Sequence, residues 1–198
     1  MHEGHRDRVK KRFRQEGLDH FSDIQALELL LFYGIPRVDT NPIAHALLDR
    51  FGSLSQVLEA SPEELMKVPG VGENAALLLT LIPQMGRFYM VDRSSRVTIL
   101  QTLEQCADFL VPHFFGRKVE TVFILCLDAK CKLLCCKELG EGGPNSTGVS
   151  IRKIVETAIG VNAATVVLAH NHPSGLAVPS AEDIQTTRRI AHALQAVE

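Results

Sequence analysis

The residues with the clearest chemical potential lie near the end of the chain, where His170 and His172 flank a single asparagine. Seven residues separate His172 from Ser180, and two more separate Ser180 from Asp183. Two imidazoles and one carboxylate form the smallest protein ligand set that holds a catalytic zinc ion and leaves one position open. Zinc in such a site polarises a carbonyl group and lowers the pKa of water. The pattern therefore predicts a hydrolase with one Zn²⁺ per chain.

A strand and a helix must position these side chains. Residues 164–169 are apolar and partly β-branched, which predicts a strand that ends at His170. Alternate residues of a strand share one face, so His170 and His172 can aim at one metal ion. Beyond a loop rich in proline and glycine, Ser180 is expected to cap a helix that runs to about residue 195.

Each of these residues also has an ordinary explanation. Ser180 is a favourable N-cap with or without a metal, and Asp183 in the first turn suits the helix dipole. The histidines could be polar residues at the exit of a strand. The combined spacing of all four residues is much rarer than any one of them, and it favours the metal site.

The composition indicates a soluble globular chain of one or two domains, with 198 residues, 45% hydrophobic and 22% charged. A net charge of −2 excludes binding to nucleic acid through overall charge. The N-terminus lacks the apolar segment of a signal peptide, and the longest apolar runs are too short to span a bilayer. Five cysteines, an odd number, argue against a disulfide framework. We expect a cytoplasmic protein with no membrane partner.

The chain divides into two regions of different pattern. Apolar residues recur at helical spacing through the first ninety residues, and Asn41-Pro42 and Ser61-Pro62 are typical helix starts. A linker at 94–96 then leads into alternating strand and helix patterns. Strands are expected at 97–100, 119–127, 131–139 and 164–169, helices at 103–114, 151–159 and 181–195, and a loop at 140–148. The sequence predicts an α/β protein with an all-helical domain at 1–93 and a mixed α/β domain at 96–198.

The metal-site motif resembles the JAMM motif, also called MPN+ or JAB, of zinc metalloproteases. Within that superfamily, residues 170–175 and 179–183 are similar to the signature of the bacterial RadC family. Residues 162–169 fit the same family, and so does a helix-hairpin-helix region before the metal domain. The resemblance covers nearly the whole chain.

This resemblance implies a cytidine-deaminase-like α/β/α metal domain that follows the helical one. By motif position it gives His170, His172 and Asp183 the role of zinc ligands. It gives Ser180 the role of stabilising the oxyanion that forms at the attacked carbonyl. RadC-like proteins continue into further strands after the last helix, so by this resemblance the chain is either naturally short or truncated at its C-terminus.

The resemblance further implies a glutamate on an earlier strand that acts as general base. Glu138 is our candidate because it lies at the end of the strand expected at 131–139, and Glu141 is its competitor. The flanking segment has glycine at 140 and 143, where the family tends to have a bulky apolar residue and a threonine or serine. A solvated glutamate at a strand end is the ordinary alternative for Glu138.

Two segments suggest a DNA partner. Residues 68–76 resemble a helix-hairpin-helix turn, in which Gly70 and Gly72 would let backbone N–H groups face a phosphate. Glu73, however, stands where DNA-binding versions carry lysine or arginine, so a purely structural hairpin is the alternative. The basic segment 5–14 could contact phosphates in a salt-dependent way, or could be a solvated helix face.

The leading expectation is a JAMM-type zinc metallohydrolase that cleaves an amide bond, either peptide or isopeptide, in a peptide or protein substrate. The alternative is a DNA-associated, repair-related protein whose zinc domain is not catalytic. Zinc-dependent deamination ranks last because the His-x-Glu and Pro-Cys-x-x-Cys signatures of deaminases are absent. The natural substrate and the oligomeric state do not follow from the sequence.

Overall fold

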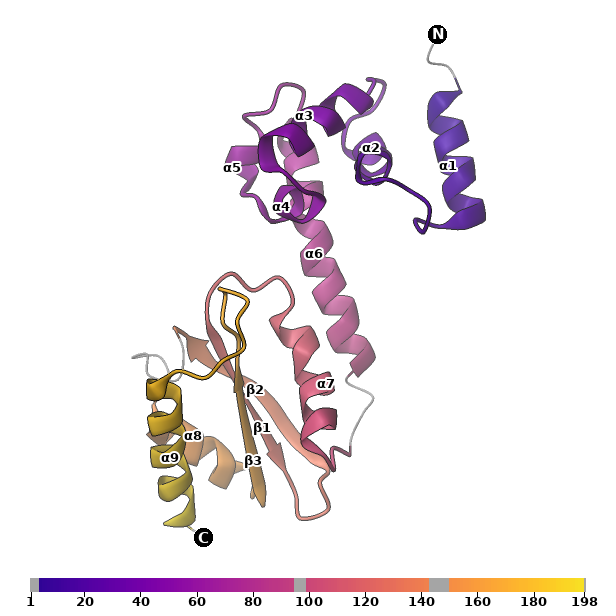
Figure 1. Cartoon of the computed structure of the whole chain (residues 1–198). Helices are drawn as coiled ribbons and strands as arrows, with labels where there is room; N and C mark the ends of the chain where they lie inside the picture. Colours follow the sequence, from indigo (N-terminus) through magenta and orange to yellow (C-terminus); the bar gives the residue numbers. More distant parts are fainter. Residues whose placement is uncertain (1–3, 95–98, 143–149, 198) are drawn as a thin grey trace. The chain divides into compact units, whose positions relative to one another are not determined.

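The computed structural model describes residues 4–94, 99–142 and 150–197. Its elements, labelled in Figure 1, are α1 (His5–Glu16), α2 (Asp23–Gly34), α3 (Asn41–Phe51), α4 (Leu54–Glu59), α5 (Pro62–Leu65), α6 (Glu73–Ser94), α7 (Leu103–Phe114), β1 (Thr121–Leu127), β2 (Leu133–Glu141), α8 (Ile151–Gly160), β3 (Thr165–His170) and α9 (Ala181–Gln195). The chain forms two compact units, Met1–Gly86 and Arg87–Glu198, and the division falls within α6. The expected fold class, N-terminal helices followed by a mixed α/β region, is confirmed.

The first unit is a set of helices around a core of its own. Leucines of α2, α3 and α5 meet the first half of α6 there, and Leu27, Leu31, Leu47, Leu65 and Leu79 are completely buried. Ser22, Ser53 and Ser61 begin α2, α4 and α5 because each hydroxyl oxygen accepts a backbone N–H of the first turn. At α3 the N-cap is Thr40, one residue before the expected Asn41.

Part of the basic segment in α1 serves internal contacts. Arg6 donates a hydrogen bond to the carbonyl oxygen of Ile35 at 2.8 Å, and its guanidinium lies 4.8 Å from the centre of the Phe32 ring. A cation at this position also suits the C-terminal end of α2. Arg12 lies 4.8 Å from the centre of the Phe21 ring. These two arginines therefore attach α1 to the following segment.

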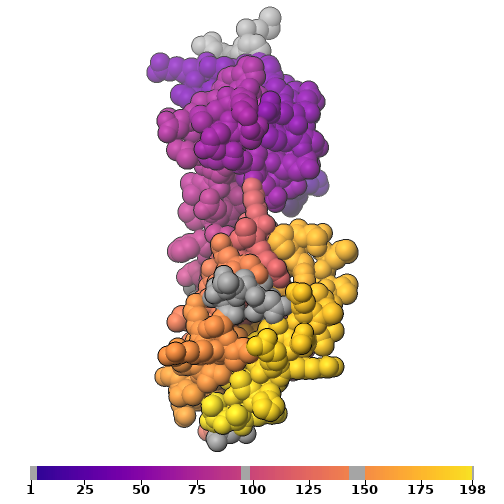
Figure 2. All heavy atoms as spheres, turned by 90° about the vertical axis from the view of Figure 1, so that its left-hand side faces the viewer, coloured from indigo at the N-terminus to yellow at the C-terminus, as the bar shows by residue number. Residues whose placement is uncertain are grey.

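The second unit contains an antiparallel sheet with the strand order β2-β1-β3. All residues of the central strand β1 are buried because helices cover both faces. On one face α7 packs against Phe123 and Leu125, and on the other α8 and α9 pack against Val122 and Ile124. Figure 2 shows α8 and α9 at the outer surface of the second face. The layers are α/β/α, as expected.

The strand boundaries differ in detail from the sequence expectations. β2 continues through Gly140 to Glu141, so the first two residues of the expected loop are strand, and residues 143–148 of that loop lie outside the described residues. In the strand expected at 97–100, Ile99 forms a single bridge with Lys132, while residues 97 and 98 also lie outside the described part. Within the described ranges no helix is both long and apolar enough to cross a membrane.

Candidate metal centre

Strand β3 ends at His170, and His172 follows two residues later. Its antiparallel pairing with β1 places His170 opposite Val122, whose side chain packs beneath α8 and α9. His170 therefore faces the helices, and the ring centres of His170 and His172 are 4.7 Å apart. Between them, Asn171 accepts a hydrogen bond from the Thr121 backbone N–H at 2.8 Å and donates one to the Val119 carbonyl at 3.2 Å. This link holds the chain beyond β3 in register with β1.

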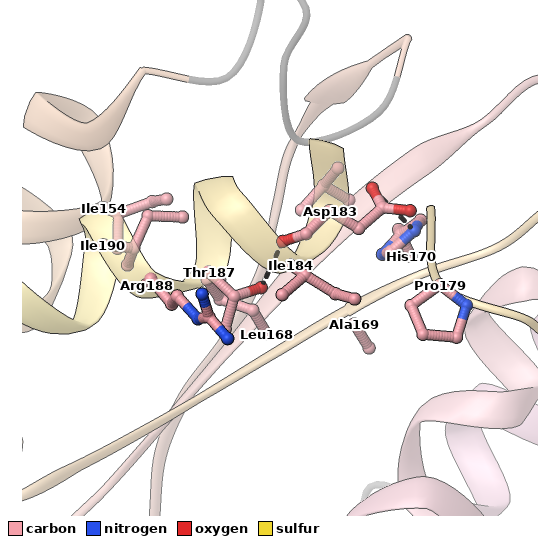
Figure 3. Close-up of a pocket in the computed structure, with 11 residues that line it drawn as sticks. Ile154, Leu168, Ala169, His170, Pro179, Asp183, Ile184, Thr187, Arg188 and Ile190 are labelled. Carbon is pink, nitrogen blue, oxygen red and sulfur yellow. Dashed lines mark hydrogen bonds and ion pairs between the residues drawn. The ribbon is translucent and has the colours of Figure 1, made fainter. Parts of the chain in front are cut away.

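The first turn of α9 brings Asp183 next to His170 (Figure 3) and close to His172. Asp183 Oδ1 lies 3.4 Å from His170 Nε2, and Asp183 Oδ2 lies 3.9 Å from His172 Nε2. The carboxylate is held by Ser180, whose backbone N–H and hydroxyl donate to Oδ2 at 2.8 Å and 2.7 Å. In return the Asp183 N–H donates to Ser180 Oγ at 3.1 Å, which completes a capping box. The structure thus brings together the three residues expected to bind zinc.

The charge state of Asp183 suits a ligand. Burial raises the pKa of this carboxyl group, because its side chain is only 9% exposed. The hydrogen bonds from Ser180 and the neighbouring imidazoles of His170 and His172 lower the pKa by more, so that it falls below its ordinary value. Asp183 is therefore ionised at neutral pH.

A second carboxylate, Glu120, lies at the same place and was not singled out from the sequence. Its Oε1 is 3.7 Å from His170 Nε2, and the ligand atoms of Glu120, His170 and His172 all lie within 4.8 Å of one another. The β-sheet register explains this position, since the pairing of Val122 with His170, continued for two residues beyond the ladder, leads to Glu120 and His172. Glu120 lies in the strand expected at 119–127, so the glutamate on an earlier strand that the resemblance implies fits it as well as Glu138, and the pairing of β1 with β3 separates the two.

The expected base, Glu138, is not brought to the histidines. It pairs with Phe123 in β2, and Phe123 packs against α7, on the face opposite to His170. There Glu138 forms an ion pair with Arg117 at 2.7 Å. Glu141, its competitor, pairs with Thr121 at the end of β2. Sequence reasoning chose a glutamate of β2 and could not assign its face, because β2 contains an irregularity opposite Val122 and Phe123.

The hydroxyl of Ser180 is already engaged. It donates to Asp183 Oδ2 and accepts from the Asp183 N–H, so in this conformation it positions the ligand carboxylate. Its expected contact with an oxyanion would require the hydroxyl hydrogen to turn away from Asp183. That role stays a prediction.

The cluster fits a divalent metal ion. His170 Nε2 is buried and has no hydrogen-bond partner among the described residues, although two carboxylates lie within 4 Å. A buried polar atom without a partner is costly, and a metal ion at this point would remove that cost. Two ligands on a tetrahedral zinc, with bonds of about 2.1 Å, lie roughly 3.4 Å apart. The His170–Asp183 distance of 3.4 Å matches this spacing.

Comparisons with known proteins match both parts of the chain. Residues 100–198 match the family model described as RadC-like JAB domain, and residues 3–77 match the model described as UPF0758 N-terminal. A UPF0758 protein of Fusobacterium nucleatum is 33% identical, over 98% of this chain and 86% of the relative. A UPF0758 protein of Paraburkholderia xenovorans is also 33% identical, over 97% of this chain and 76% of the relative.

Proposed function

The chain belongs to the RadC family, and on that premise we propose that it is a zinc-dependent metallohydrolase that cleaves an amide bond of a peptide or protein. A JAB domain has a metallohydrolase-like fold, which supports the general class. The observation that carries the proposal is the approach of His172, Asp183 and Glu120 to the unpaired Nε2 of His170. Several potential ligands and an unsatisfied buried nitrogen meet at one point.

In this proposal His170, His172 and Asp183 hold the metal, and Glu120 is the general base. Asp183 is the better ligand of the two carboxylates because it is the more buried and is fixed by Ser180. Glu120 is 31% exposed, so its carboxylate can exchange protons with solvent. Zinc bound here would polarise the scissile carbonyl and acidify water.

Glu120 accepts a proton from the attacking water and then gives it to the departing amine nitrogen. The carboxylate lies on the same side of the sheet as both histidines, which this transfer requires. Ser180 keeps Asp183 in place during the reaction. Asn171 keeps the histidine segment in register with β1 through its two hydrogen bonds.

Zinc content tests the proposal directly. We expect about one zinc ion per wild-type chain, and its loss when His170 and His172 are both replaced by Ala. His192→Ala is a matched control, because that imidazole is exposed on the last turns of α9. Metal would be measured by mass spectrometry after dialysis. Retention of zinc by the double variant would refute the proposed metal site.

Hydrolysis is measured on the same preparations, with peptide and isopeptide substrates. We expect turnover only where zinc is retained. Full zinc loading without hydrolysis of any amide would refute the enzymatic part of the proposal and favour a metal domain that is not catalytic.

A further inference from the structure

A cavity of about 380 Å³ adjoins the metal centre. It lies between α9 and the sheet, and His170 and Asp183 form part of its wall (Figure 3). Its apolar lining comes from several elements and includes Val122, Ile154, Leu168, Ile184 and Ile190. Because two of the proposed metal ligands also line the cavity, a group bound there lies next to the reacting centre.

Arg188 gives this cavity a cation, while the carboxylate of Asp183, which also lines it, is held by Ser180. Thr187 also lines it, but its hydroxyl donates to the Asp183 carbonyl oxygen at 2.7 Å, so that hydrogen is already used. Arg188 lines the cavity and makes no hydrogen bond or ion pair with any other residue that the structure describes. A guanidinium beside an apolar wall is suited to bind a carboxylate through paired hydrogen bonds.

We propose that this cavity selects the substrate: it takes an aliphatic side chain next to the scissile amide, and Arg188 pairs with a carboxylate further along the peptide. The inference rests on the proposed function, because the scissile amide is placed by the metal centre. Five helical positions separate Asp183 from Arg188, a rise of about 7.5 Å along α9. That rise corresponds to roughly two residues of an extended peptide.

Two groups of a peptide could supply the carboxylate that pairs with Arg188. It is either an acidic side chain or the C-terminal carboxylate of the peptide. Both present two oxygens to a guanidinium, so the cavity fits both and experiment must separate them.

Binding of short labelled peptides tests the proposal without relying on catalysis. The probes carry fluorescein and end in Leu-Asp-amide, Leu-Asn-amide, Ser-Asp-amide or Leu-Ala with a free carboxylate. Fluorescence anisotropy would be read on the wild-type protein, with intact probe verified by mass spectrometry. We expect the Leu-Asp-amide probe to bind at least about tenfold more tightly than the Leu-Asn and Ser-Asp probes, since charged hydrogen bonds and apolar burial are each worth this much. The free-carboxylate probe shows which source is preferred.

Arg188→Gln should remove the advantage of the carboxylate probes and leave Leu-Asn binding unchanged. Arg189→Gln is the matched control, because it removes the same charge from the next residue, which does not line the cavity. Arg188→Lys should restore part of the preference. Equal effects of the Arg188→Gln and Arg189→Gln changes, or equal binding of the Ser-Asp and Leu-Asp probes, would overturn the inference.

Zinc content and turnover of the same samples separate the two proposals. Zinc and hydrolysis without any dependence on Arg188 would overturn this inference alone. A preference that depends on Arg188 in a protein without zinc or hydrolysis would overturn the proposed function while the cavity keeps its ligand.

Discussion

The face of the sheet that a glutamate occupies decides whether it can act as a base at this site. Glu120 and Glu138 lie near the same end of the sheet, but Glu120 is beside His170 and Glu138 is on the α7 face with Arg117. A side chain beneath α7 cannot take a proton from water held between α9 and β3. Strand pairing therefore decides which glutamate can act as the general base.

We predict that Glu120→Gln keeps zinc and lowers kcat by about 10²- to 10⁴-fold, the usual contribution of a general base. Glu138→Gln should leave turnover within a few-fold of wild type. Because the Glu138–Arg117 pair is partly exposed, its loss should cost at most about 1 kcal/mol of stability. Steady-state kinetics and metal analysis of both variants measure these effects.

Two results would contradict this assignment. If Glu120→Gln lost zinc, Glu120 would be a ligand, as its place in the three-residue cluster also allows. If Glu138→Gln lost as much turnover as Glu120→Gln, the base would act from the other face.

The proximity of the three proposed metal ligands could be predicted from sequence because they are local in the chain. His170, His172 and Asp183 lie within fourteen positions, and period-two and N-cap rules orient them. Glu120 lies fifty residues before His170. No local rule connects two residues at that separation, and only the β1–β3 register brings them together. A glutamate at the start of a buried strand carries no signal by itself.

At the level of elements, the N-cap residue of α9 has two roles. Ser180 satisfies the first turn of the helix and also fixes the carboxylate of Asp183, a proposed ligand. Ser150 offers a comparison, because it caps α8 by accepting from the Lys153 N–H at 3.2 Å and holds no ligand. A comparison of variants at these two serines can therefore distinguish the effect of helix capping from an effect on the proposed metal site.

We predict that Ser180→Ala and Ser150→Ala each cost about 1 kcal/mol of unfolding free energy in zinc-free protein, as lost N-caps do. Only Ser180→Ala should also weaken zinc binding, by about 10- to 100-fold, the usual effect of losing a residue that orients a ligand. Urea unfolding and competitive zinc titration measure the two effects. Equal zinc affinity in both variants would show that Ser180 is only a cap.

Helices were predicted from sequence more accurately than the sheet. The apolar stripe of α8 and the serine before α9 determine those helices within their own segments, and both lie where expected. The end of β2 was placed two residues early, since Gly140 and Glu141 resemble a turn and are paired with β1 only in the folded sheet. Strand pairing depends on distant partners that a local pattern does not contain.

In the basic helix α1, packing within the first unit reduces the number of cations that could contact DNA. Arg6 and Arg12 are used in internal contacts, which leaves Arg8, Lys11 and Arg14 exposed on the helix. Glu73 occupies the first turn of α6 and would repel a phosphate at that helix start. Contact of this unit with DNA stays a prediction, and it would depend on these three cations and on low salt.

For the whole molecule, each unit has a hydrophobic core built from its own residues. The buried cluster of the first unit ends at Leu79, and the two clusters on the sheet begin at Leu100. The proposed ligands all belong to the second unit. A metal ion should therefore stabilise one unit directly and leave the other nearly unchanged.

We predict two thermal transitions in calorimetry, of which zinc shifts only one. An ion that binds the folded state alone stabilises it by about 2.7 kcal/mol when its free concentration is 100 times Kd. For a unit of roughly 100 residues this raises Tm by about 10 °C or more. Removal of zinc with a chelator should reverse the shift, and the protein with both His170 and His172 replaced by Ala should show none.

If both transitions moved together, the cores would not be independent. If neither moved although zinc was bound, the ion would bind the unfolded chain equally well, and a preformed site of His170, His172 and Asp183 would be ruled out.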